Sequence, residues 1–343
     1  MKGDLGNFFE DFEIGRRSLC PVPRVLGGAE TALHIATTND RTARFCSAEG
    51  RVHPLIVFHL VIAQTVRQIS LNARANLGYA GMVWRQPVFY GDEITTGIEI
   101  TGLKENSNRE TGNVWVKTIA RNQRDEIVLE YTRWVMVKKR DTALATRFLD
   151  EPFVPVLQKA VAVEDLPHFE GELPTAAKTG GRFLFEDYQP GERIFHHDGM
   201  TVNTSDHTSY TRLFQNTAKV HFDAILTQGR PLVYGGLPMS VAYAQALNGL
   251  ENRSGIVAMN SGAHANPCYA GTTIYSFTDV LETHLVAGTG FGALRLRLIA
   301  VKDFNPAGEP DFAIEIKDEK GRSRHDPRVL LDMDHWELMP TRA

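Results

Sequence analysis

The sequence predicts an α+β protein made of two similar halves, each with one long helix wrapped by a curved antiparallel β-sheet. Three observations predict this fold class: a long internal repeat, one helix-length apolar run in each half, and alternating strand patterns after each run. With 343 residues, 43% of them hydrophobic, the chain is long enough for two domains of ordinary size. We therefore expect a duplicated domain.

The repeat is clearest near its start, where FEDFEIGRR (Phe9–Arg17) recurs as FEDYQPGER (Phe185–Arg193), 176 residues later. At the same offset Phe45 falls on His221. A period this long indicates a duplicated domain, because solenoid units span only about 20 to 50 residues. The other matched pairs, in chain order, are Asn39–Ala43 with Gln215–Lys219, Pro54–Leu60 with Pro231–Leu237, Pro87–Asp92 with Pro267–Thr272, and Val128–Trp134 with Leu330–Trp336.

Each half contains an apolar helix followed by strands. Residues 55–68 and 237–250 are rich in Leu, Val, Ala and Ile at helical spacing, and Asn248–Gly249 is a good helix end. The alternating segments 113–119 and 293–298 are typical of half-buried antiparallel strands. One long helix wrapped by such a sheet is the hotdog layout, so the sequence predicts a double hotdog.

The domain boundaries follow from the same pattern. We expect a first hotdog over 1–140 and a second over 182–343. Residues 141–181 contain several prolines, show no sustained period and end at Gly180–Gly181, so this segment is predicted to be a linker over the surface.

Composition excludes several classes of function. The net charge is −4 without a clustered positive field, which disfavours nucleic acid and anionic membranes as partners and favours a small molecule. Cys20, Cys46 and Cys268 have no zinc-like or disulfide-like spacing, so no metal site is predicted and a reducing cytoplasm fits. The N-terminus has no apolar signal region, and no run of about 18 apolar residues occurs, so secretion and membrane spanning are also disfavoured.

Short sequence motifs, called words below, are spread over nearly the whole chain and carry a family resemblance. They are Asn7–Phe12, Ile69–Asn72, Asn76–Ala80, Gly102–Asn106, Arg133–Val137, Gln215–Phe222, Val233–Gly236 and Gly292–Arg295. With these words the chain resembles the MaoC-like hotdog hydratases, and more closely the double-hotdog mesaconyl-CoA hydratases, also called β-methylmalyl-CoA dehydratases. The resemblance implies an enzyme that adds or removes water across a double bond next to a CoA thioester. It implies no separate cofactor, because CoA is part of the acyl-CoA substrate.

MaoC-type hydratases resemble one another in an Asp-x-Asn-Pro-x-His word, whose Asp and His flank the water to be added. In this chain the first half has Asp40 but carries Phe45 in the His place, whereas the second half has His221 with Asn216 in the Asp place. Histidine has an ordinary pKa that suits proton transfer near neutral pH. We therefore expect one working site, in the second half, with His221 as acid/base group and Asn216 orienting the water or the imidazole.

Five further residues are candidates for this site. The backbone N–H groups of Gly235 and Gly236, at the predicted helix start, are placed to hold the negative oxygen of the thioester enolate. Asp206 and His207 match the family word and are candidates to orient His221 or to serve as a second acid/base group. Arg212 is a candidate to bind a free carboxylate of the substrate, because guanidinium pairs with carboxylate through two hydrogen bonds.

Two other functions stay open at this point. Hotdog folds also serve CoA thioesterases, which want a carboxylate near the central helix, and residues 237–250 contain none. A non-catalytic acyl-CoA-binding relative is the second alternative, with Asn216 as the start of the decay that Phe45 represents. Asn216 is also a common turn residue, and Gly235–Gly236 a common helix entry. Further association into homo-oligomers is left open by the sequence.

Overall fold

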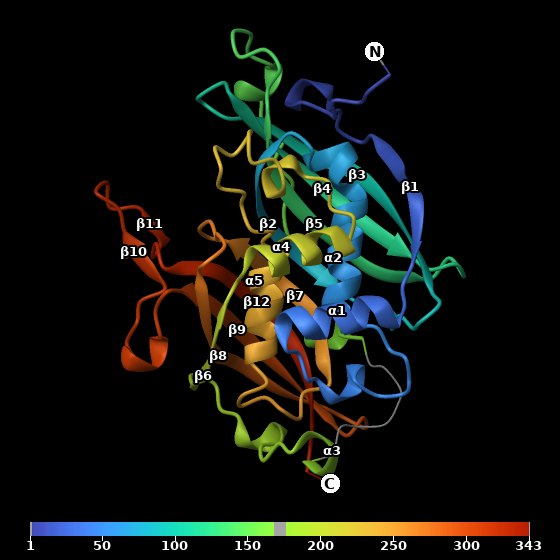
Figure 1. Ribbon diagram of the computed structural model, residues 1–343, viewed down its shortest axis with the longest axis vertical. Helices are drawn as coiled ribbons and strands as arrows, with labels where there is room; N and C mark the ends of the chain where they lie inside the picture. Colours follow the sequence, from blue (N-terminus) through green and yellow to red (C-terminus); the bar gives the residue numbers. More distant parts are fainter. Residues whose placement is uncertain (1, 168–175, 343) are drawn as a thin grey trace.

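The computed structural model describes residues 2–167 and 176–342, and in these residues ten antiparallel strands form one continuous sheet (Figure 1). The strands of this sheet are β1 (Arg17–Val25), β2 (Ala73–Val83), β3 (Glu93–Glu105), β4 (Thr111–Arg121), β5 (Ile127–Lys138), β6 (Arg193–Thr201), β7 (Gly255–His264), β8 (Thr273–Val286), β9 (Phe291–Lys302) and β12 (Val329–Pro340). A separate hairpin is formed by β10 (Glu315–Lys317) and β11 (Ser323–His325). The helices are α1 (Gly28–Thr38), α2 (Pro54–Thr65), α3 (Ala176–Thr179), α4 (Thr204–Leu213) and α5 (Gly236–Gln245).

The duplication is visible in the strand order. The first half runs β1-β3-β4-β5-β2 from its edge inward, and the second half runs β6-β8-β9-β12-β7 in the same way. The halves join where β2 pairs with β7 in the middle of the sheet. Helices α1 and α4 begin 176 residues apart, at Gly28 and Thr204. The predicted double hotdog is confirmed by this arrangement.

The two predicted central helices are present, and each begins one residue before its predicted range. The first, predicted over 55–68, is α2 followed by a π-helical turn over Val66–Ser70. The second, predicted over 237–250, is α5, which starts at Gly236 and ends at Gln245 because tighter i→i−3 hydrogen bonds close the next residues. The match of Pro54–Leu60 with Pro231–Leu237, which pairs Phe58 and His59 with Gly235 and Gly236, is therefore wrong, since α2 starts at Pro54 and α5 at Gly236.

Loop length explains this correction. Pro54, at the start of α2, stands nine positions after Phe45, but Gly236, at the start of α5, stands fifteen positions after His221. The extra six residues lie in a loop with turns around 224–229. The second half therefore has a longer loop before its central helix, and an alignment that lacks this six-residue gap pairs Gly235 and Gly236 with the wrong residues of the first half.

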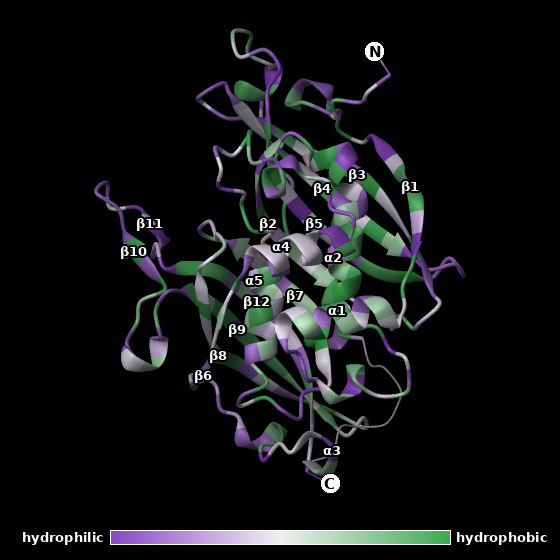
Figure 2. Ribbon diagram, in the orientation of Figure 1, coloured by the Kyte–Doolittle hydropathy of each residue, from purple (hydrophilic) through white to green (hydrophobic). Residues whose placement is uncertain are grey.

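The helices lie together against one face of the sheet, and hydrophobic residues gather where α2 and α5 cross its middle (Figure 2). A row of buried hydrogen bonds joins the helices of the two halves there. His34 Nδ1 lies 3.0 Å from the Tyr210 hydroxyl, which donates to Ser240 Oγ at 2.8 Å. His59 Nε2 lies 2.8 Å from the same Ser240 Oγ, and its Nδ1 lies 3.1 Å from the Tyr234 hydroxyl. Several buried polar side chains of the helices are thus satisfied through hydrogen bonds that cross the boundary between the halves.

The predicted linker over 141–181 is partly packed onto the sheet. Val161 and Leu166 are buried in a core cluster separate from the helix-facing one, and the Trp336 indole donates to the Val161 carbonyl at 3.1 Å. Residues 168–175 of this segment lie outside the described residues. The boundaries 1–140, 141–181 and 182–343 stay a prediction.

Candidate active site

A cavity of about 410 Å³ lies between the halves and is lined by both. The first half contributes the end of α2 and the start of β2, and the second half contributes the loops before α5 and after β7. A volume of this size is typical of a small-molecule site. Of the candidates from the sequence, His221, Asn216 and Gly235 line it, whereas Gly236, Asp206, His207 and Arg212 are not among its lining residues.

His221 is held in one protonation form by its backbone contact. It is the last residue of the single turn Lys219–His221, and its Nδ1 lies 2.8 Å from the carbonyl oxygen of Leu232. A carbonyl oxygen only accepts, so Nδ1 carries the proton and Nε2 keeps a free lone pair. Burial lowers the pKa of His221 to about 4. The imidazole is therefore neutral at physiological pH, with an unprotonated nitrogen available to take a proton from water.

Asn216 combines a turn contact with a free amide nitrogen. Its Oδ1 accepts the N–H of Ala218 at 3.0 Å, as Asp40 Oδ1 accepts the N–H of Thr42 at 2.8 Å in the first half. The side chain is 5% exposed and lines the cavity. With the oxygen fixed in the turn, its Nδ2 is left as a donor toward the cavity.

His207 positions the loop that carries His221. Its Nδ1 accepts from the N–H of Tyr234 at 3.4 Å, so its Nε2 is protonated and donates to the carbonyl oxygen of His221 at 3.0 Å. The rings of His207 and His221 are 6.2 Å apart, centre to centre. His207 therefore holds the backbone of His221, and this contact does not orient the imidazole directly.

Asp206 and Arg212 have other contacts. The Asp206 carboxylate accepts from the backbone and side chain of Asn203 at 3.2 and 3.1 Å, which closes the first turn of α4. Arg212 is exposed on α4, with its guanidinium 5.7 Å from the centre of the Phe222 ring. Neither side chain is brought to the cavity, so we propose no site role for either.

The glycines at the start of α5 let neighbouring side chains pack closely against the backbone. A Cβ atom on Gly235 would lie 2.8 Å from the His264 ring, and one on Gly236 would lie within 2.6 Å of both Tyr234 and His59. Among the hydrogen bonds of the described residues, none uses the N–H of Gly235 or Gly236. These N–H groups stand at the positive end of a ten-residue helix.

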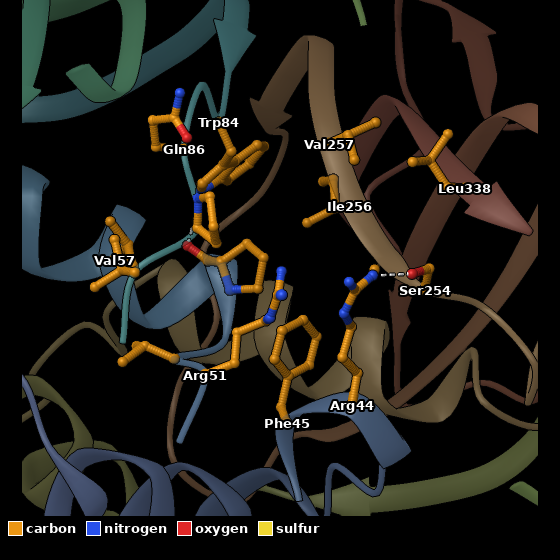
Figure 3. Close-up of a pocket in the computed structure, with 15 residues that line it drawn as sticks. Arg44, Phe45, Arg51, Val57, Trp84, Gln86, Ser254, Ile256, Val257 and Leu338 are labelled. Atoms are coloured by element: carbon orange, nitrogen blue, oxygen red, sulfur yellow. Dashed lines mark hydrogen bonds between the residues drawn. The ribbon is translucent and has the colours of Figure 1, made fainter. Parts of the chain in front are cut away.

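The matching place in the first half is nearly filled. The pocket there has a volume of about 30 Å³. Figure 3 shows the Phe45 ring between the side chains of Arg51 and Arg44. The Arg44 guanidinium donates a hydrogen bond to the Ser254 hydroxyl. The Phe45 ring packs against His53 at 4.6 Å between centres. The asymmetry expected from Phe45 and His221 is therefore matched by a large difference in open volume.

Behind Phe45 lies a buried cluster of His34, Asp40 and His53, close enough together to suggest a metal site. The Leu55 N–H donates to His53 Nδ1 at 3.0 Å, so the proton of this ring sits on Nε2, which faces Asp40 Oδ2 at 3.3 Å. A metal-binding histidine instead donates from its second nitrogen. This tautomer opposes a metal ion, and the cluster is better described as a buried close contact between an imidazole and a carboxylate.

Histidine burial predicts acid sensitivity of the fold. Burial lowers the pKa of four histidines to about 4, namely His53, His196, His221 and His264. Since the unfolded value is about 6.5, the unfolded state binds more protons below it, and stability is lost as the pH falls from about 6.5 toward 4. Urea unfolding between pH 7.5 and 4.5 should give a falling midpoint. His221→Gln should reduce this fall of the urea midpoint with pH, while His197→Gln, at an exposed position, should not. A midpoint independent of pH would contradict the prediction.

No protein-family profile matches the chain. It is 46% identical to the mesaconyl-CoA hydratase of Cereibacter sphaeroides over 353 aligned residues, which cover 99% of this chain and 100% of that protein. It is 40% identical to the β-methylmalyl-CoA dehydratase of Chloroflexus aurantiacus, covering 100% and 99%. The chain belongs to this mesaconyl-CoA hydratase family. Membership places it among the hydro-lyases, as the resemblance predicted.

Solved structures support the same fold for this member of the mesaconyl-CoA hydratase family. A MaoC-domain dehydratase from Chloroflexus aurantiacus superimposes with a TM-score of 0.91 at 40% identity, covering 100% of both chains. A double-hotdog protein of Mycobacterium tuberculosis gives a TM-score of 0.70 at 22% identity, covering 97% of this chain and 98% of its own.

Within the described residues, no helix is both long and apolar enough to cross a membrane.

Some cavity residues of this family member were not anticipated from the sequence. Tyr234 lies beside His221, with ring centres 5.6 Å apart, and the Tyr79 hydroxyl is 3.1 Å from His264 Nε2. Tyr79 and Tyr234 stand inside words quoted for the resemblance, which was the available signal. Their roles depend on contacts between the halves, which a pattern within one half does not reveal.

Proposed function

We propose that this chain interconverts mesaconyl-CoA and β-methylmalyl-CoA by reversible hydration in the cavity that His221 lines. The observation that carries the proposal is the free Nε2 lone pair of His221 at the wall of an open cavity, while the matching pocket of the other half is filled. The activity named for the two relatives supports the substrate. We also propose that the protein binds an acyl-CoA ester, acts in the cytoplasm and associates into homo-oligomers.

In this mechanism the Asn216 amide holds a water molecule against the β-carbon of the enoyl group. His221 Nε2 takes one proton from this water as its oxygen bonds to the β-carbon, and the electrons of the double bond move toward the thioester oxygen. The imidazolium then gives that proton to the α-carbon. All atoms of water are thereby accounted for, and His221 returns to its starting form.

The negative charge that develops on the thioester oxygen needs donors fixed in advance. We assign this role to the backbone N–H groups of Gly235 and Gly236, supported by their lack of other acceptors and by the helix dipole of α5. A thioesterase is disfavoured because α5 carries no Asp or Glu.

The test compares three esters: mesaconyl-CoA, crotonyl-CoA and a saturated CoA ester, with enoyl absorbance and free thiol followed together. Hydration lowers the absorbance without releasing thiol. Thiol release would instead establish a thioesterase, and binding without turnover would establish the non-catalytic alternative. Either of those results would overturn the proposal.

Asp40→Ala should leave turnover within a few-fold of the parent but destabilise the fold. Asp40 is 3% exposed and accepts from Thr42, while His53 and His34 hold the pKa of its carboxyl well below its usual range although burial alone would raise it. Removing it leaves buried donors unpaired, at a cost of about 1–3 kcal/mol. Activity assays and urea unfolding check this. A loss of turnover equal to that of a His221 variant would overturn the assignment of one site.

A further inference from the structure

Arg133 is a buried cation at the wall of the cavity. It lies on β5, is 1% exposed, and lines the same cavity as His221. One terminal nitrogen donates to Thr65 Oγ1 at 2.7 Å and the other to Asn76 Oδ1 at 3.3 Å, and both acceptors are neutral. Its Nε has no hydrogen-bond partner. No described Asp or Glu forms an ion pair with it.

Other buried cations of this chain do face carboxylates. Arg253, which is also 1% exposed, has a terminal nitrogen 3.7 Å from Glu337 Oε1, and Lys139 Nζ lies 2.7 Å from Glu105 Oε1. An unpaired charge in the protein interior is costly, because burial removes its hydration. These two buried cations therefore have carboxylate partners within the chain, whereas no described carboxylate pairs with Arg133.

The surroundings of Arg133 are suited to an anion. The Nδ2 of Asn76 is a second buried donor without a partner, and it belongs to a side chain that also lines the cavity. Across the β2–β5 ladder Arg133 pairs with Tyr79, so their side chains share one face of the sheet. Tyr79 in turn contacts His264, which packs under Gly235. Arg133 is therefore linked to the proposed oxyanion site through its ladder partner Tyr79 and the contact of Tyr79 with His264.

We propose that Arg133, assisted by Asn76, binds the free carboxylate of a dicarboxylic enoyl-CoA and so selects this substrate class over simple enoyl-CoA esters. The inference rests on the proposed hydratase function and adds its determinant of specificity. A planar guanidinium matches a carboxylate through two parallel hydrogen bonds, and burial strengthens the pairing. Arg133 takes the role that the sequence suggested for Arg212, which is exposed and outside the cavity.

The test uses Arg133→Met and Arg133→Lys, with Arg212→Met as a matched control outside the cavity. For Arg133→Met, kcat/KM with mesaconyl-CoA should fall by about 10²- to 10³-fold, the effect of removing one partner of a buried charge pair. The fall with crotonyl-CoA, which has no free carboxylate, should be at least tenfold smaller. Arg133→Lys should recover part of the selectivity for mesaconyl-CoA. Arg212→Met should leave kcat/KM unchanged for both substrates.

Binding of saturated esters separates this inference from the hydratase proposal. Succinyl-CoA should bind Arg133→Met about 10²-fold more weakly than the parent, with butyryl-CoA affected at least tenfold less. If the parent binds succinyl-CoA selectively but hydrates neither enoyl ester, the function fails and the carboxylate site stands. Equal losses for both esters, or no loss, would overturn the carboxylate site. The thermal midpoint of Arg133→Met should not fall, since an uncompensated buried charge is removed, whereas a structural arginine would lower it.

Discussion

Replacing His221 with Ala is expected to lower kcat with mesaconyl-CoA by about 10²- to 10⁴-fold, the usual contribution of a positioned acid/base group. The reason is the Leu232 contact, which fixes the proton on Nδ1 and leaves Nε2 free for catalysis. Steady-state kinetics should show the loss mainly in kcat. His221→Gln should be similarly impaired, because an amide cannot take the proton from water.

Two comparisons make this result interpretable. Asn216→Ala should cost less than His221→Ala, because orienting a water contributes less than moving its proton. The exposed His197→Ala should match the parent, since it lies on β6 away from the cavity lining. Parent-like kcat in His221→Ala would remove the basis of the proposed mechanism.

Gly235→Ala is expected to lower kcat by about 10²-fold, the scale of losing one oxyanion donor. Its backbone, with φ −57° and ψ −22°, suits alanine, so the effect comes from the added methyl group. That group would lie 2.8 Å from the His264 ring, which is held by Tyr79, so either the ring or the start of α5 must move. Kinetics with mesaconyl-CoA and a thermal melt would measure both consequences.

Gly308→Ala is the matched control for this substitution. Nothing lies within 4 Å of the position where its Cβ would be built, and it stands far along the chain in a short turn before β10. It should leave kcat unchanged. If Gly235→Ala also kept the parent kcat, the oxyanion role of the α5 N-terminus would be wrong.

The sequence predicted the fold well because the duplication carries the same pattern twice. The offset between Phe9 and Phe185 also relates α1 to α4, whose start positions were not predicted. The match between the halves failed at the central helices, because a six-residue difference in loop length shifts the alignment there by more than one helical turn. Local patterns reveal elements reliably when both copies agree and fail where the copies differ in length.

For the site, the motif led to His221 and Asn216 but not to Arg133. The first two are close in sequence, so their spacing in one loop is readable. Arg133 reaches the cavity from the other half, and its lack of a counter-ion is a property of three-dimensional packing. Arg212 was favoured by its nearness to Asn216 along the chain, yet α4 exposes it to solvent.

Because the two hotdogs are fused in one chain, their sequences can differ at matching positions. Identical subunits of a homodimer cannot differ in this way. In a homodimer, any exchange of imidazole for phenyl would appear in both catalytic clefts at once, and no functional copy would survive. Here one copy carries Phe45 and the other His221, while the polar row through Tyr210 and Ser240 keeps the copies registered. In the proposed mechanism the first half therefore has no proton to transfer, and it contributes ligand-binding side chains such as Arg133 instead.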